Sequence, residues 1–238
     1  MSEMHPCRKR LRSLAKPSKV PEYQRFFKTG KGEYGEGDLF LGIKVPDIRN
    51  VVREYHRELN LSDLEEIVSS PYHEERMFAL LVLVYKYKSR SNSKESKKSI
   101  FDFYLKHMNF INNWDLVDVT APHIIGMHLL DKDRKVLYRL AKSKNLWEKR
   151  ISIISTFPFI NSHEFDDSLN ISDILLKDEH DLIHKAVGWT LRNIGIKNLQ
   201  TEIEYLKPRY KTMPRTLLRY AIEKFEPSLR KKYLLGEI

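Results

Sequence analysis

The sequence predicts an all-α protein built from repeated helix pairs. Three observations predict this class. Apolar residues recur with the 3.6-residue period of helices along nearly all of the 238 residues. Glycine and proline number only 9 and 10, and the alternation that marks strands between turn pairs is absent. The predicted helices also come in pairs that recur along the chain, which is the pattern of a helical solenoid.

The N-terminal part begins with MSEMHPCRKRLRSLAK, a basic segment without the apolar stretch of a signal peptide, which we interpret as a first helix. Pro46 suits the first position of the helix PDIRNVVREYHREL, because proline has no N–H to leave unbonded there. The polar segment at residues 89–98, SRSNSKESKK, is expected to be a loop. We expect one repeat domain over residues 1–238, with residues 1–20 as an N-terminal helical extension.

The helix pairs then follow one another. In each, a first amphipathic segment precedes a second one, and the pairs cover residues 61–87, 96–125, 133–157, 167–195 and 199–225. This organisation predicts a HEAT-like helical-repeat solenoid.

Composition narrows the function. The excess of 42 Lys and Arg over 32 Asp and Glu gives a net charge of +10, which favours a polyanionic partner, nucleic acid before a membrane surface. No run of about eighteen apolar residues is present, so no membrane span is expected. Cys7 is the only cysteine, which excludes an internal disulfide and fits a reducing cytoplasm.

The second helices of the pairs share a charged position near their start. It holds Arg76, Arg150, Lys185 and Arg215, whereas the pair containing NNWDLVDVTAPHII holds Asp118 instead. Because a solenoid presents equivalent positions side by side, the sequence predicts a concave basic groove with one carboxylate set into it.

Asp118 has a distinctive neighbourhood. Trp114 precedes it by four residues, so both side chains lie on one helix face. Pro122 lacks the N–H that would bond the carbonyl of residue 118, so the helix should bend there. Trp189 follows Lys185 by four residues and brings a second indole toward the groove. The residues alone leave two interpretations open: a carboxylate between aromatic walls, or core tryptophans with Asp118 paired to Arg150.

Three further patterns are weaker. Gly30–Gly35 matches G-x-G-x-x-G, but no strand precedes it and Glu33 and Glu36 would repel phosphate, so a nucleotide site is rejected. His180 and His184 are one turn apart without an evident third metal ligand, so no metal site is expected. The C-terminal cations are either a solvated face or phosphate contacts; they are Lys207, Arg209, Lys211, Arg215 and Arg219.

Four segments resemble the DNA alkylation repair glycosylases of the AlkD type: NWDLVD, LWEKR, KAVGWTLR and LFLGIKVPDIR. The resemblance extends from about Pro21 to Phe225, and NWDLVD together with KAVGWTLR is its most specific part. It implies a HEAT-like fold that cradles duplex DNA and an enzyme that excises N7-alkylguanine and N3-alkyladenine. It also implies that the base need not be flipped out of the helix, and no motif for a base-specific pocket is present.

Carried over residue by residue, the resemblance places the catalytic carboxylate at Asp118 and the paired indoles at Trp114 and Trp189. Arg150 matches the groove arginine and Arg192 a further basic position. The tyrosine of the family pattern near the N-terminal helices corresponds here to Phe26 or Phe27, so that DNA contact is ambiguous.

The sequence-based expectation is therefore a cytoplasmic, monomeric DNA glycosylase of base-excision repair, acting at the nucleoid on double-stranded DNA without a cofactor. DNA binding is assigned to Arg76, Arg150, Lys185, Arg192, Arg215 and Phe26. Two alternatives stay open, a non-catalytic HEAT-like DNA-binding protein and a protein-interaction scaffold whose basic groove binds an acidic partner.

Overall fold

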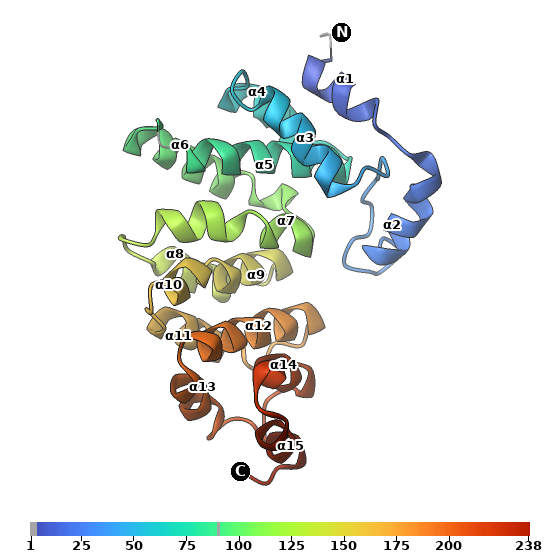
Figure 1. The fold of residues 1–238 in the computed structure, drawn as a ribbon. Helices are drawn as coiled ribbons and strands as arrows, with labels where there is room; N and C mark the ends of the chain where they lie inside the picture. The colour runs from blue at the N-terminus through green and yellow to red at the C-terminus, as the bar shows by residue number, and fades with distance from the viewer. Residues whose placement is uncertain (1–3, 90) are drawn as a thin grey trace. The chain divides into compact units, whose positions relative to one another are not determined.

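The computed structural model describes residues 4–89 and 91–238, and its regular structure is helical (Figure 1). No β-strand occurs in these two ranges, where an isolated bridge pairs Leu39 with Tyr72. The predicted all-α class is thus confirmed. The chain forms two compact units, Met1–Ile124 and Ile125–Ile238. The expectation of one repeat domain over residues 1–238 stays a prediction.

The N-terminal unit is organised around one long buried helix, α5. Residues Met77–Val84 of α5 are all buried, and α5 contacts α3, α4, α6 and α7. The α-helices of this unit are α1 (Pro6–Arg12), α2 (Val20–Phe26), α3 (Val45–Tyr55), α4 (Leu61–Val68), α5 (His73–Lys88), α6 (Lys94–Lys106) and α7 (Trp114–Asp118), and two 3₁₀ turns, η1 (Pro17–Lys19) and η2 (Met108–Phe110), accompany them.

Helix α1 is held on this unit by ion pairs with a buried acid. Glu75 of α5 has a fully buried side chain, and its carboxylate accepts hydrogen bonds from Arg8 at 2.9 Å and from Arg12 at 2.6 Å. Desolvation alone would raise the pKa of Glu75, but these bonds outweigh it and lower the pKa. Part of the basic excess therefore stabilises the fold.

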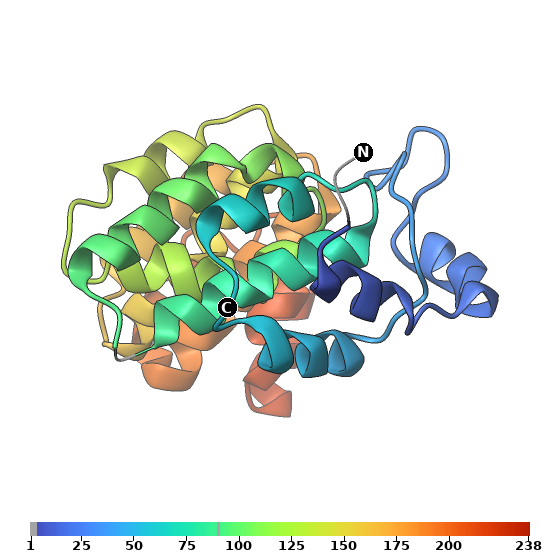
Figure 2. The ribbon, with the colours of Figure 1, turned by 90° about the horizontal axis from the view of Figure 1, so that it is seen from above.

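Helix α2 differs from its neighbours because none of its residues is buried. Figures 1 and 2 show it standing apart from the other helices of this unit. A loop that includes Gly32, Gly37 and Gly42, all with positive φ, connects α2 to α3. Pro46 is the second residue of α3, one position later than predicted, and still lies in the first turn, where its missing N–H is tolerated.

The polar segment at residues 89–98 is a loop only in its first part. Ser93 accepts a hydrogen bond from the Ser96 N–H and caps α6, so Lys94–Lys98 are helical and the expected loop was too long. The Ser/Lys composition resembles a loop, but a capping serine followed by an amphipathic segment begins a helix. Arg90 lies outside the described residues.

The C-terminal unit is organised around α12. This helix contacts α9, α10, α11, α13 and α14. The helices of this unit are α8 (Lys135–Ala141), α9 (Leu146–Ile154), α10 (Phe157–Asn161), α11 (Asp166–Leu175), α12 (Asp181–Lys197), α13 (Leu199–Leu206), α14 (Arg215–Ala221), the 3₁₀ turn η4 (Ile222–Lys224) and α15 (Pro227–Leu235). Gly188 lets α12 and α14 approach closely, since a Cβ there would lie 2.6 Å from the Leu217 carbonyl oxygen.

All the helices of the predicted pairs are present. They are α4 with α5, α6 with α7, α8 with α9, α11 with α12, and α13 with α14. The solenoid and its concave groove stay predictions, because they concern both units together. In the part of the chain that is described, no helix combines the length and apolarity that a membrane crossing requires.

Candidate active site and nucleic-acid interface

The short helix α7 carries the candidate carboxylate at its end. Trp114 is its first residue and Asp118 its last, and Asn113 caps it. After a turn at residues 119 and 120 the backbone forms a π-helical turn, Pro122–Gly126. The predicted break at Pro122 is confirmed, because proline cannot donate to the carbonyl of Asp118. Asp118 is half-buried and therefore accessible to solvent.

A pocket of about 940 Å³ lies beside Asp118 and is rich in cations. Its charged lining residues are Arg49 and Arg57 of α3 and its C-terminal end, Lys86 and Lys88 of α5, and Asp118. None of these four cations has an ion-pair partner among the residues that the structure describes. We call this feature the cationic groove. Such a surface suits a polyanion, because phosphates can replace the missing counter-charges.

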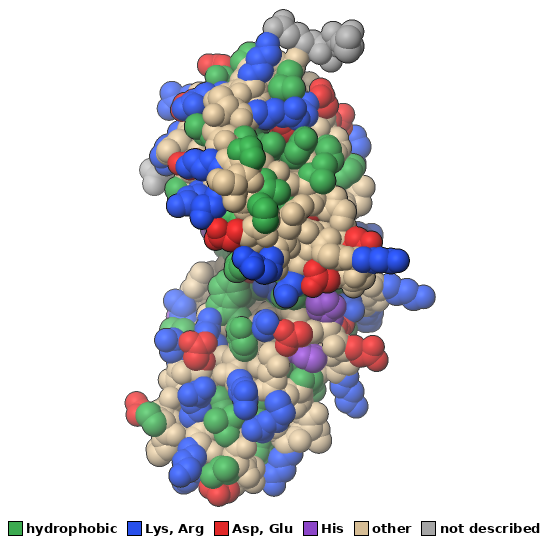
Figure 3. Space-filling model, turned by 90° about the vertical axis from the view of Figure 1, so that its right-hand side faces the viewer, with side chains coloured by type: hydrophobic (Ala, Val, Ile, Leu, Met, Phe, Trp, Pro, Cys, Tyr) green, Lys and Arg blue, Asp and Glu red, His purple; other side chains and the backbone are tan. Residues whose placement is uncertain are grey.

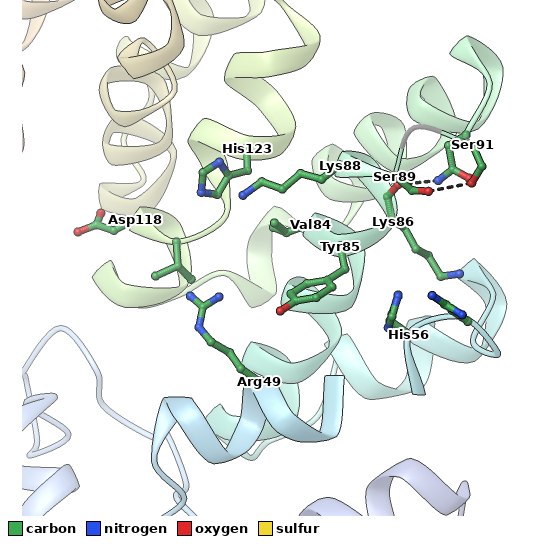
Figure 4. A pocket seen from close by; sticks show the side chains of 13 residues that line it. Arg49, His56, Val84, Tyr85, Lys86, Lys88, Ser89, Ser91, Asp118 and His123 are labelled. Carbon is green, nitrogen blue, oxygen red and sulfur yellow. Dashed lines mark hydrogen bonds between the residues drawn. The ribbon is translucent and has the colours of Figure 1, made fainter. Parts of the chain in front are cut away.

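The positive potential of the cationic groove also acts on its titratable groups. Burial, together with Arg49, lowers the pKa of Lys88. Burial, together with Lys88 and Arg49, lowers the pKa of His123, so this imidazole is neutral at pH 7. Figure 4 shows Arg49, Lys88 and His123 extending into the groove, while the carboxylate of Asp118 lies at its edge and points away from them.

An aromatic cluster surrounds Trp114. Its indole stacks on the Phe27 ring with the ring centroids 5.7 Å apart. It meets the Phe26 ring edge-on at a centroid distance of 5.8 Å. The Phe27 ring also stacks on the Phe40 ring, with the centroids 5.2 Å apart, whereas the Phe26 side chain is 60% exposed. Figure 3, seen from the side on which α2 lies, shows hydrophobic side chains gathered on the N-terminal unit. Of the two candidate phenylalanines, Phe26 is therefore the one available to a partner.

Beneath the aromatic cluster lies a buried network of charges. His73 bridges Asp115 at 2.8 Å and Asp38 at 3.3 Å, and Arg76 bonds Asp38 at 2.7 Å. Burial favours neutral His73, but Asp115 and Asp38 outweigh it and raise the pKa of His73 to about 9. Asn112 joins the network by donating to Asp38.

The structure corrects the prediction for Arg76. Its side chain is 3% exposed, and its guanidinium donates to Asp38, to Asn112 and to the Ser70 carbonyl. The comparison of equivalent positions in the helix pairs placed Arg76 among the groove cations. Arg76 lies near the start of α5, which is a buried helix, and its side chain faces the interior of the unit. Arg76 stabilises the floor of the aromatic cluster instead.

The remaining predicted residues belong to the C-terminal unit. Arg150 is 5% exposed and donates to the Leu182 carbonyl at 2.6 Å, and its predicted DNA contact stays a prediction. Lys185 pairs with Asp181 at 2.6 Å, and Arg192 pairs with Glu223. Arg215 is exposed.

Trp189 of α12 is half-buried and meets Phe157 edge-on at 4.8 Å. One ring contact leaves part of its indole exposed. Its predicted role beside Asp118 stays a prediction, as do the DNA contacts of Lys185, Arg192, Arg215 and Phe26.

The weaker motifs acquire local roles. The N–H groups of Gly30 and Gly32 donate to the carboxylates of Glu33 and Glu36, which occupy positions that a phosphate would need. The His180 side chain caps α12 by accepting from the Leu182 N–H, and His184 contacts the Asp178 carbonyl. No cluster of metal-ligating side chains occurs within residues 4–89 and 91–238. Arg209 pairs with Asp173 at 2.8 Å, so at least one C-terminal cation is used structurally.

Sequence reasoning missed the cations that line the groove. Lys86 and Lys88 lie in the last turn of α5, and Arg49 lies in the middle of α3. The alignment of helix starts could not find them. The two lysines could have been found from the sequence. They lie in the last turn of their helix, too far from the acidic residues that the helix dipole favours in the first turn to pair with them.

Comparisons with known proteins agree with this fold. The helical pairs and the cationic groove define an all-helical protein suited to nucleic acid. Residues 7–225 match the family described as DNA alkylation repair enzyme, and the chain belongs to this family. A solved structure described as a predicted DNA alkylation repair enzyme from Enterococcus faecalis matches with a TM-score of 0.68 and 17% identity, over 90% of this chain and 97% of that one. No curated protein matches the chain.

Proposed function

We propose that the protein is a DNA glycosylase that removes cationic alkylated purines, N7-alkylguanine and N3-alkyladenine, from duplex DNA in base-excision repair. The observation that carries the proposal is the position of Asp118 at the edge of the cationic groove, in a chain of the DNA alkylation repair family. The groove cations bind backbone phosphates, which positions the duplex without reading its sequence.

The chemistry follows from the charge of the substrate. An N7- or N3-alkylated purine is already a cation, and it leaves the sugar as a neutral base. No general acid is needed, so one carboxylate suffices where glycoside hydrolysis usually uses two. Asp118 stabilises the oxocarbenium-like sugar and orients, or deprotonates, the attacking water.

The indoles of Trp114 and Trp189 hold the deoxyribose and the developing cation against their π faces. Trp114 is suited to this because Phe26 and Phe27 fix its ring. His123 does not act as a general acid in this mechanism. Its imidazole is neutral, because burial and the positive potential of the groove lower its pKa.

A panel of duplexes that differ only in the lesion tests the proposal under single turnover. N7-methylguanine and N3-methyladenine should be excised, whereas uracil, hypoxanthine and 1,N6-ethenoadenine should stay in place, because the rate tracks charge already on the base. Efficient removal of a neutral base would reveal a general acid and overturn this mechanism. Failure to remove any cationic lesion would favour a non-catalytic DNA-binding protein.

A further inference from the structure

Helix α7, which carries Trp114 and Asp118, is too short to fix its own orientation. It has five residues, whereas an isolated helix of fewer than about 12 residues is marginal in water. The π-helical turn that begins at Pro122 follows it, so no regular α-helix extends it. Contacts with the rest of the N-terminal unit must therefore hold it in place, and α7 packs beside α5 (Figure 1).

A buried histidine joins α7 to α5. His73 is the first residue of α5 and is 3% exposed, and its Nε2 lies 2.8 Å from a carboxylate oxygen of Asp115. Asp115 follows Trp114 directly, so its side chain projects about 100° around the helix from the indole. It is 7% exposed, whereas Trp114 and Asp118 are half-buried. The pair therefore holds the inner face of α7 and leaves the candidate site residues toward solvent.

The other side of the imidazole holds the segment that leads into α7. The Nδ1 atom of His73 lies 3.3 Å from Asp38. Asp38 in turn accepts hydrogen bonds from Arg76 at 2.7 Å and from the Asn112 amide at 2.8 Å. Asn112 precedes the first residue of α7 by two positions. One network thus fixes both the start of α7 and its inner face.

The charges of this network balance only when His73 is protonated. Its two carboxylates, Asp38 and Asp115, and its one guanidinium, Arg76, are all buried. An imidazolium makes the sum zero, whereas a neutral ring leaves a net negative charge in the interior. A neutral imidazole also has one N–H only, so one carboxylate would face a lone pair. Burial and Arg76 disfavour the charged ring, but the two acids outweigh them and raise the pKa of His73 to about 9.

Two further acids line the pocket on which His73 borders, and both have other partners. Glu22 pairs with Lys19 at 2.8 Å, and Glu74 accepts the Gly42 N–H at 2.8 Å. Neither acid bonds the imidazole in the described ranges. The protonation of His73 therefore depends on the network itself.

Aromatic rings connect His73 to the indole by a second route. The imidazole lies against the rings of Phe27 and Phe40, with a centroid distance of 4.9 Å in each case. Ring faces attract a cation at this range. The Phe27 ring in turn stacks on Trp114. The charged imidazole therefore supports the indole as well as the helix that carries it.

We infer that His73, as an imidazolium, is a positioning residue for excision, which holds α7 so that Trp114 and Asp118 face the sugar of the lesion. The inference rests on the proposed function and adds a residue that no sequence pattern indicated. Because His73 is buried, it acts through Asp115 and the aromatic rings. Its effect is complete below the ordinary pKa of 6.5 and is lost as pH rises through about 9.

Nitrogen-resolved NMR of the full chain tests this role without requiring excision. Both ring nitrogens of His73 should carry protons at about pH 7.5 and titrate with a midpoint of about 9. The indole N–H of Trp114 should shift with the same midpoint, whereas that of Trp147, in the C-terminal unit, should not follow it. Asp115→Asn should lower both midpoints by at least about one pH unit, because the imidazolium loses a counter-charge.

Single-turnover excision of N7-methylguanine at saturating protein supplies the second measurement. The wild-type rate should fall as pH rises through about 9, and Asp115→Asn should move this fall to lower pH by the amount seen in NMR. Titration of the lesion, or of the cations that bind DNA, is common to both proteins and cancels in the comparison. These measurements need no variant at His73, so they decide the inference even if such a variant is insoluble.

Substitution of the histidine gives a third measurement. His73→Gln cannot bridge two acids, so excision at about pH 7.5 should be about 10- to 100-fold slower, with duplex affinity unchanged within about twofold. His107→Gln is the matched control and should keep the wild-type rate. His107 is a buried histidine of the same unit that bonds the Phe103 carbonyl of α6.

A neutral His73 at about pH 7.5, or a Trp114 resonance that does not follow its titration, would overturn the inference whether or not the protein excises. Excision that stays constant while His73 loses its proton would reject the positioning role and leave the glycosylase proposal intact. Linked titrations in a protein that excises no cationic lesion would support the hold of His73 on α7 and reject the glycosylase.

Discussion

Cations on α5 of the N-terminal unit and on α9 and α12 of the C-terminal unit are compensated to different extents. In the C-terminal unit Lys185 and Arg192 form ion pairs, and Arg150 is buried against a carbonyl. In the N-terminal unit Lys86 and Lys88 lie in the last turn of α5 without ion-pair partners among the described residues. Acids are favoured in the first turn of a helix by its dipole, so a cation four residues on finds a partner there. Lys86 and Lys88, in the last turn of α5, have no such acid within reach on their own helix.

The buried acids differ as well. Glu75 in the N-terminal unit is surrounded by arginines, which hold its pKa below the usual value. Glu202 in the C-terminal unit is 2% exposed, and one of its oxygens has no hydrogen-bond partner. Burial raises the pKa of Glu202 to about 9, and Arg192 offsets this only in part. The first acid stabilises the fold as an anion and the second only when protonated.

The largest expected effect comes from the acid of the N-terminal unit. Asp118→Asn removes the negative charge that stabilises the sugar cation, so excision of N7-methylguanine should fall by at least about 10²-fold. DNA affinity should be unchanged or slightly higher, because one repulsive charge is lost. Single-turnover excision and duplex binding on the same variant measure both. Near-wild-type excision would remove Asp118 from the catalytic role.

Glu202→Gln should sharpen the contrast between the buried acids. The folded pKa of Glu202 is about 9 against an ordinary 4.5, so its stabilising effect is complete below the lower value and is lost as pH rises through the upper one. The Gln variant does not ionise. At about pH 8 it should be more stable than the wild type by roughly 1–3 kcal/mol. Urea unfolding across pH gives the difference; parallel curves would contradict the raised pKa.

The two indoles, one in each unit, should have smaller and comparable effects. Trp114→Ala and Trp189→Ala each remove a π face from the cation, worth about 0.5–2 kcal/mol, or roughly 2- to 30-fold in excision rate. Phe225→Leu, at a buried aromatic outside the proposed site, is the matched control. A loss for Trp114→Ala alone would confine the site to the N-terminal unit.

The smallest effect expected for any one residue concerns the groove cations. Binding of undamaged duplex should weaken with salt, and Arg49→Ala or Lys88→Ala should each flatten the slope of log K against log salt by about one unit. Lys185→Ala should flatten it less, because Asp181 already compensates that charge. Fluorescence anisotropy over a salt series measures the slopes. A wild-type slope near zero would favour the protein-interaction scaffold.

Sequence reasoning found the helices better than it found the orientation of the charges. The 3.6-residue period indicated both helices of each predicted pair, and Pro122 indicated the bend after Asp118. Trp114 and Asp118 were found because their spacing is local. Arg76 was misplaced because a shared position along a helix does not state which way that helix faces its unit.

The sequence by itself determined the all-helical class, the family, and the single helix that carries Trp114 and Asp118, since each depends on short-range periodicity or on a contiguous motif. Only the tertiary structure decided which cations lie without ion-pair partners among the described residues and which phenylalanine is exposed. These features bring together residues from α2, α3, α5 and α7, and burial and charge compensation depend on such long-range neighbours rather than on sequence spacing.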